Sequence, residues 1–328
     1  MIIGFNTIFA GQKFTPAQNI TTTYNTPNIK IKNTLTKDTV SFGNNDLLNC
    51  SKEEITARIK ETLRDSKMHY LGAGNSAEVF KIFQSDYCVR IPYQNGDYTS
   101  NVPNIINQKN LKINFNLSEQ DKINHVVGKF KGGCIMKYIE GTPVLNPTMS
   151  KNHIDEISKQ IEEMPVESFH KLLQQICHAY QHNMMFDCSW NNVIVNPKNK
   201  TLTAIDFYNL EGFHEVSHPF SHIFASLTHS QTTPEQKKNF AGKILTAGLM
   251  EVEPEHKPCL DIRDFDYYRF IYKLQEQNLI QNPKYTNLLI KLFEEIECLK
   301  LRDLQGDDVS KTLNHKIKTV KCLIKQLL

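Results

Sequence analysis

A pair of glycines one residue apart forms a possible phosphate-binding turn. The run that contains them is Gly72, Ala73, Gly74, Asn75, Ser76 and Ala77. Glycine has no Cβ, so the backbone can approach a phosphate closely and direct N–H groups at it. Most such pairs are ordinary hairpin turns, and a dinucleotide-binding turn would need a helix directly after it. Residues 78–82 predict a strand instead, so the run predicts a hairpin that covers a nucleotide.

Two acidic residues and an asparagine further along the chain could hold a metal ion and a hydroxyl group. Asp187 and Asn192 are separated by four residues, and Asp206 ends the apolar run Leu202-Thr-Ala-Ile205. A carboxylate can orient a hydroxyl group and accept its proton. Carboxylate and amide oxygens are the ligands that Mg²⁺ prefers. Alone, each residue could simply cap a turn, but the ordered set behind a strand–glycine–strand unit predicts one shared site.

Short β-rich runs and longer helical patterns must position these residues. Strands are predicted at 69–74, 77–83, 87–91, 126–130 and 133–139, with a hinge at 140–143. The hydrophobic spacing from Phe169 to Tyr180 predicts a helix, and helices dominate from Pro219 onward. Two further strands, 193–195 and 202–205, are joined by a turn at 196–199. The pattern predicts an α+β fold with two lobes: a tail at 1–50, a small β-rich lobe at 51–141 and a larger helical lobe at 142–328.

Composition excludes several other classes of protein. The net charge of the 328 residues is only +3, which argues against a nucleic-acid partner. The eight cysteines include no C-x-x-C pair, so we expect core-filling thiols in a reducing compartment. No stretch is apolar enough for a transmembrane segment, and the N-terminus lacks the pattern of a cleavable secretory signal. We expect a cytoplasmic protein, or one exported without such a signal.

The motifs together resemble those of the protein-kinase-like superfamily, over about residues 68–328. The resemblance implies that ATP and Mg²⁺ bind between the lobes and that the γ-phosphoryl group moves to a hydroxyl. Asp187 would be the catalytic base, and Asn192 and Asp206 the metal ligands. The other residues it assigns to nucleotide binding are Gly72, Ala73, Gly74, Asn75, Ser76, Ala77, Val79, Arg90, Glu119, Met136 and Tyr138. Of these, Met136 and Tyr138 lie in the run 136–143, which resembles the family's hinge.

Departures from the family pattern bear on activity and substrate. Arg90 stands where strand three usually carries Lys, and an Arg is not interchangeable with an ammonium; Lys81 is an alternative cation. Glu119 is a candidate acidic partner for that cation. Phe186 replaces the Arg that usually precedes the catalytic Asp, and no glycine follows Asp206-Phe207. These traits resemble aminoglycoside and choline phosphotransferases and bacterial effector kinases.

Three hypotheses about function follow. The first is transfer to Ser or Thr of a protein, with a host protein as a possible partner. The second is transfer to a small-molecule hydroxyl. The third is a pseudokinase that acts as a binding module, which the replacement of the strand-three Lys favours.

Overall fold

The computed structural model describes residues 68–73, 77–82, 86–92, 126–130, 133–145, 149–181, 184–209, 218–250 and 267–328. Several predicted features lie outside the described residues: the tail at 1–50, the acid Glu119, and the loop residues Gly74, Asn75 and Ser76.

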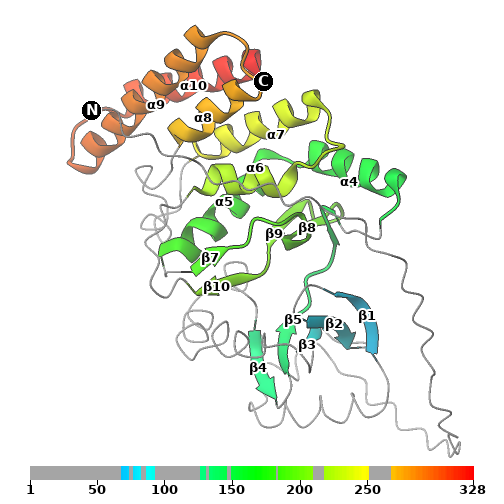
Figure 1. The fold of residues 1–328 in the computed structure, drawn as a ribbon. Helices are drawn as coiled ribbons and strands as arrows, with labels where there is room; N and C mark the ends of the chain where they lie inside the picture. Colours follow the sequence, from blue (N-terminus) through cyan, green and yellow to red (C-terminus); the bar gives the residue numbers. More distant parts are fainter. Residues whose placement is uncertain are drawn as a thin grey trace, which may run out of the picture. The chain divides into compact units, whose positions relative to one another are not determined.

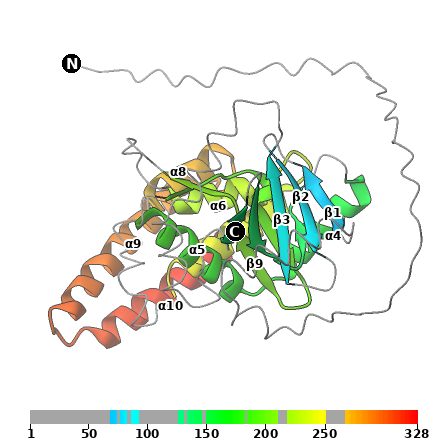
Figure 2. The same ribbon diagram turned by 90° about the horizontal axis from the view of Figure 1, so that it is seen from below.

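The N-terminal part is one five-stranded antiparallel sheet, formed by the five β-rich runs that the sequence predicts as strands. Its strands are β1 (Met68–Ala73), β2 (Ala77–Ile82), β3 (Tyr87–Pro92), β4 (Val126–Phe130) and β5 (Gly133–Lys137), in the order β1-β2-β3-β5-β4. Figure 2 shows β1, β2 and β3 side by side. Strand β5 ends two residues before the predicted 139, although the amide of Tyr138 still donates to the carbonyl of Asp86 at 2.7 Å, in register with the pair Tyr87–Lys137.

The C-terminal part is mostly helical. Its helices are α4 (Lys151–Glu163), α5 (Val166–Gln181), α6 (Pro219–Leu227), α7 (Pro234–Ala247), α8 (Tyr267–Glu276), α9 (Pro283–Leu304) and α10 (Ser310–Leu327). The predicted stripe on α5 is buried, since Phe169, Leu172 and Ile176 are each 0% exposed. Figure 1 shows α5 beside β7 and β9, which it contacts. The helical core is therefore built around α5, which packs against β7 and β9, the strands that lead to Asp187 and Asp206.

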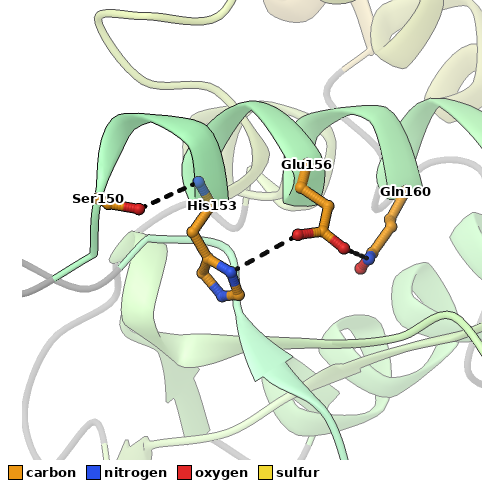
Figure 3. Close-up of polar contacts among 4 residues, drawn as sticks. All are labelled: Ser150, His153, Glu156 and Gln160. Atoms are coloured by element: carbon orange, nitrogen blue, oxygen red, sulfur yellow. Dashed lines mark hydrogen bonds and ion pairs between the residues drawn. The ribbon is translucent and has the colours of Figure 1, made fainter.

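Helix α4 begins at a capped N-terminus, shown in Figure 3. The hydroxyl of Ser150 accepts a hydrogen bond from the backbone N–H of His153 at 3.4 Å. One turn further, Glu156 accepts a hydrogen bond from Gln160 at 3.3 Å and faces His153 at 3.8 Å. At the other end of α4, Lys243 donates to the backbone carbonyls of Glu162 and Met164. Both ends of α4 thus have side-chain partners for their free backbone groups.

Two small sheets lie in the C-terminal part. One pairs β6 (Thr142–Pro143) with β8 (Val193–Asn196), and β8 with β9 (Thr201–Ala204). The other pairs β7 (Met184–Phe186) with β10 (Phe207–Asn209). Strands β8 and β9 were predicted from the sequence, whereas β6, β7 and β10 were not. Strands of two or three residues are too short to show any periodicity.

Gly141 lets the predicted hinge approach β8. A Cβ built on it would lie 2.5 Å from the carbonyl oxygen of Val195, and its φ is +141°. The close contact leaves no room for a side chain, and a φ of this value is rare for any residue that has a Cβ. Position 141 therefore requires glycine.

The expectation that the cysteines are core filler is only partly right. The cysteines are not all core filler: Cys88 and Cys177 are buried, but Cys298 and Cys322 are exposed. Cys298 lies on the solvated face of α9 and Cys322 on that of α10. The apolar character of a thiol is therefore not sufficient to bury it.

No helix within the described ranges is long and apolar enough to cross a membrane.

Candidate functional site

The loop from Asp187 to Asn192 is a tight, self-bonded turn that follows β7. The backbone N–H of Ser189 donates to the carbonyl of Asp187 at 2.8 Å, and that of Asn192 donates to the carbonyl of Ser189 at 3.0 Å. A single 3₁₀ turn, Trp190–Asn192, then leads into β8. The side-chain N–H of Asn192 also donates to the Asp187 carbonyl at 3.1 Å. Because the amide nitrogen of Asn192 is used in this way, its Oδ1 is the atom left to act as a ligand.

The structure brings Asp206 to the same loop. The backbone N–H of Asp187 donates to the carbonyl of Asp206 at 3.3 Å, and that of Ile205 donates to the carbonyl of Asn192 at 2.8 Å. Strand pairing supports these bonds on either side: Phe186 faces Phe207 across β7 and β10, with their ring centroids 5.5 Å apart. The three residues predicted from their order and spacing among the strands are therefore joined through their backbones.

A backbone of unusual conformation presents the carboxylate of Asp206. Its φ is +63°, a left-handed conformation that non-glycine residues adopt infrequently. The strand before it is held by Gln175 of α5, whose side chain accepts from the N–H of Ala204 and donates to its carbonyl, both at 2.9 Å. Such conformations persist where the surroundings determine them, and they are concentrated at functional sites.

Burial makes the charge of Asp206 costly. Desolvation raises the pKa of its carboxyl group, the positive charge of Arg90 opposes this rise, and the negative charge of Asp187 adds to it. No hydrogen bond or ion pair joins this carboxylate to another side chain within the part of the chain that the structure describes. A cation at this position would relieve the cost.

The donor set fits Mg²⁺. The carboxylate of Asp206 and the Oδ1 of Asn192 are both hard oxygen donors, and Asn192 is only 4% exposed, so its side chain is well packed. Among the described residues no cluster of three or more His, Cys, Asp or Glu could hold a metal ion. Mg²⁺ does not require one, since it is usually bound by one or two protein carboxylates together with phosphates and water.

One face of the N-terminal sheet carries several of the predicted nucleotide-binding residues. Val79 pairs with Arg90 across β2 and β3, and Cys88 pairs with Met136 across β3 and β5. Directly paired residues and residues two apart share a face, so Val79, Arg90 and Met136 point to the same side of the sheet. Lys81 shares that face, but its Nζ lies 3.9 Å from the ring centroid of Tyr138. Lys81 is therefore engaged by an aromatic ring, and Arg90 is the cation whose charge acts on Asp206.

The predicted hinge residue Tyr138 has its backbone N–H committed to Asp86. An adenine that met Tyr138 would therefore have to use its carbonyl group or its ring. Further along the same segment, the carbonyl of Glu140 accepts from the side chain of Asn196 at 3.1 Å. The segment after β5 is thus tied to the sheet on one side and to the β8–β9 turn on the other.

The described part of the glycine-rich run ends β1 and begins β2. A Cβ added to Gly72 would meet nothing within 4 Å, so packing inside the protein does not explain this glycine. Between β1 and β2, Gly72 pairs with Val79 and Ala73 pairs with Glu78. On the other side of β2, Ala77 pairs with Pro92 of β3. The open space beside Gly72 is compatible with the close approach of a ligand.

Two residues of the site were not predicted from the sequence. Gln175 supports Ala204, and Ser189 donates its hydroxyl to Oδ1 of Asp187 at 3.1 Å. A signal for Gln175 was present, because it lies three residues after Leu172 on the apolar face of α5, where a polar residue needs a buried partner. Ser189 carried no such signal, since serine is ordinary in a turn.

No protein-family model and no curated protein matches this chain. Among solved structures that match is the ternary complex of APH(2")-IIa with streptomycin and ATP. The identity is 13% and the TM-score 0.36, over 70% of this chain and 93% of that one.

Proposed function

We propose that this protein is a kinase-like phosphotransferase, which binds ATP with Mg²⁺ and transfers the γ-phosphoryl group to a hydroxyl. The observation that carries the proposal is the convergence of Asp187, Asn192 and Asp206 through the backbone bonds that join the two β-strand pairs. Asp206, which follows β9, is joined by backbone bonds to the turn that carries Asp187 and Asn192, and the order and types of the three residues are those used in phosphoryl transfer.

Each residue has a distinct role in this proposal. Asp187 orients the acceptor hydroxyl and takes its proton as the oxygen attacks phosphorus. Asp206 and Oδ1 of Asn192 hold Mg²⁺, which when bound neutralises charge on the phosphates. Arg90 of β3 pairs with a phosphate, and the turn around Gly72 covers the triphosphate. Catalysis in this class depends on positioning and electrostatics, so these groups are sufficient.

The acceptor is proposed to be a Ser or Thr hydroxyl of a protein, with a small-molecule hydroxyl as the alternative. The motivation for a protein acceptor is the resemblance to effector-type kinases. The small-molecule alternative stays open because the lack of a glycine after Phe207 resembles aminoglycoside and choline phosphotransferases as well. The purified chain is incubated with labelled ATP and Mg²⁺, separately with casein, choline and streptomycin. Label on casein or on the chain itself supports a protein acceptor, and label on choline or streptomycin supports the alternative.

Matched variants test the enzyme itself. Asp187→Ala is expected to abolish transfer while the increase in melting temperature caused by MgATP remains, because Asp187 acts on the acceptor. Asp206→Ala is expected to abolish both. Asp303→Ala removes an exposed acid on α9 and should change neither. Equal transfer by the wild type and Asp187→Ala would refute the proposal.

A second candidate is a binding module with little or no turnover, and one electrostatic observation favours it. The guanidinium of Arg90 already stabilises the charge of Asp206, the carboxylate that would bind Mg²⁺. A protein cation in this role competes with a metal ion. If ATP raises the melting temperature equally with Mg²⁺ and with EDTA, and no phosphate is transferred, this candidate is supported. An Arg90→Lys variant that gains turnover would also support the binding-module candidate, because it would show that Arg90 suppresses catalysis in the wild type.

A further inference from the structure

Ser189 stands where a side chain would normally cap the following turn, but it does not do so. It is the residue directly before the 3₁₀ turn Trp190–Asn192, with an extended backbone (φ −84°, ψ 150°). Serine at such a position commonly accepts a hydrogen bond from a backbone N–H of the turn. Here the hydroxyl makes no capping bond and instead donates to Oδ1 of Asp187 at 3.1 Å.

The backbone holds both partners of this bond in one small ring. The N–H of Ser189 donates to the carbonyl of Asp187 at 2.8 Å, and the carbonyl of Ser189 accepts from the N–H of Asn192 at 3.0 Å. The side chain of Asn192 binds the same Asp187 carbonyl at 3.1 Å. The backbone of Ser189 is therefore held in place, and from it the hydroxyl reaches the carboxylate of Asp187 two residues earlier in the chain.

A fixed donor on one oxygen determines where the other oxygen lies. A carboxylate rotates about its terminal torsion across a broad energy well, so an unrestrained Asp187 would present its oxygens over a range of positions. A general base must come within about 2.6–3.2 Å of the proton it accepts, and small misplacements reduce rates strongly. A hydrogen bond to Oδ1 leaves Oδ2 as the oxygen that faces the acceptor.

We propose that Ser189 is a positioning residue for Asp187. Its hydroxyl holds Oδ1, so that Oδ2 receives the acceptor's proton while the acceptor oxygen bonds to the γ-phosphorus. The bond from that phosphorus to the β-phosphate oxygen breaks, and ADP leaves with the electron pair. The inference rests on the proposed phosphotransferase function and adds a residue that the motif spacing did not single out.

A set of variants separates this role from a merely structural one. ADP formation from MgATP is measured with casein, choline and streptomycin as acceptors, for the wild type, Ser189→Ala, Ser189→Thr and Asp187→Ala. Ser189→Ala should lower kcat by about 10- to 100-fold, with an unchanged KM for ATP. Ser189→Thr retains a hydroxyl and should restore most of the rate. The control Thr319→Ala removes an exposed hydroxyl, bonded to the carbonyl of His315 on α10, and should have no effect.

Each outcome decides the inference. If Ser189→Ala turns over like the wild type while Asp187→Ala is inactive, the inference is wrong and the proposed function stands. If the wild type forms no ADP, or Asp187→Ala forms as much, the proposed function fails and the inference fails with it. If Ser189→Ala raises the KM for ATP and Thr does not rescue it, Ser189 is structural only. Should Ser189→Ala fail to fold, Ser189→Cys replaces it: a clear fall in kcat supports the role, and a wild-type kcat overturns it.

Discussion

His222 on α6 is held in its neutral form, and this predicts a specific loss of stability in acid. Its Nδ1 is hydrogen-bonded to the hydroxyl of Tyr180, and a neutral ring can accept there, whereas an imidazolium cannot. Burial lowers the pKa of His222 from 6.5 to about 4, and the neighbouring charges of His218 and Lys273 contribute in the same direction. The unfolded chain keeps the ordinary pKa of about 6.5.

The sign and size of the effect follow from these two pKa values. Between about pH 4 and 6.5 the unfolded state binds more protons at this residue than the folded state, so stability falls as the pH falls through this window. Below the folded pKa both states are protonated and the loss levels off. For a shift from 6.5 to about 4, linkage gives a loss of about 2 kcal/mol between pH 7.5 and pH 5, and about 3 kcal/mol by pH 4.

Urea denaturation from pH 7.5 to pH 4 measures this loss. His222→Gln keeps an amide oxygen that can accept from Tyr180 but cannot titrate, so the variant should lose about 2 kcal/mol less than the wild type by pH 5. His315→Gln, at an exposed position on α10, controls for the removal of a histidine and should follow the wild type. Parallel pH curves for the wild type and His222→Gln would refute the reasoning, because His222 would then have the same pKa in both states.

Three further substitutions test contacts that hold the site. Gly141→Ala should destabilise the fold by about 1–3 kcal/mol in urea denaturation, because its Cβ would overlap the Val195 carbonyl; an effect near zero would mean that the hinge can move away. Gln175→Leu should cost about 2–4 kcal/mol, since it leaves both backbone groups of the buried Ala204 without partners, and it should also weaken the MgATP-induced rise in melting temperature. Lys243→Met should cost about 1–3 kcal/mol by freeing the last carbonyls of α4, and a loss no greater than that of the exposed Lys311→Met would contradict this.

Much of the local structure could be predicted from the sequence. The β-rich runs bounded by turn residues placed β2, β3, β4, β8 and β9 within one or two residues of their observed bounds. The apolar spacing of α5 predicted a helix whose stripe is buried. These signals are local, because period-2 and period-3.6 patterns are properties of a short stretch of chain. The two-lobed arrangement stays a prediction.

The candidate site was predicted only in part. The spacing of Asp187, Asn192 and Asp206, together with their order behind the strand–glycine–strand unit, nominated them, and the structure joins them through backbone hydrogen bonds. The partners of these residues could not be found in the same way. Gln175 reaches Ala204 from a helix that lies earlier in the chain, and only packing determines which buried groups it can satisfy. The roles assigned to Glu119 and to residues 74–76 stay predictions, because they lie outside the described residues.

The sequence by itself determined which residues could do chemistry and which segments would form strands and helices, because side-chain type and periodicity are local properties. Only the tertiary structure decided the environment of each functional group. It placed the charge of Arg90 where it acts on Asp206, engaged Lys81 with the ring of Tyr138, and directed the hydroxyl of Ser189 to Asp187. Burial, charge and hydrogen bonding act through space, so groups far apart in the chain set each other's chemistry only once the fold has brought them together.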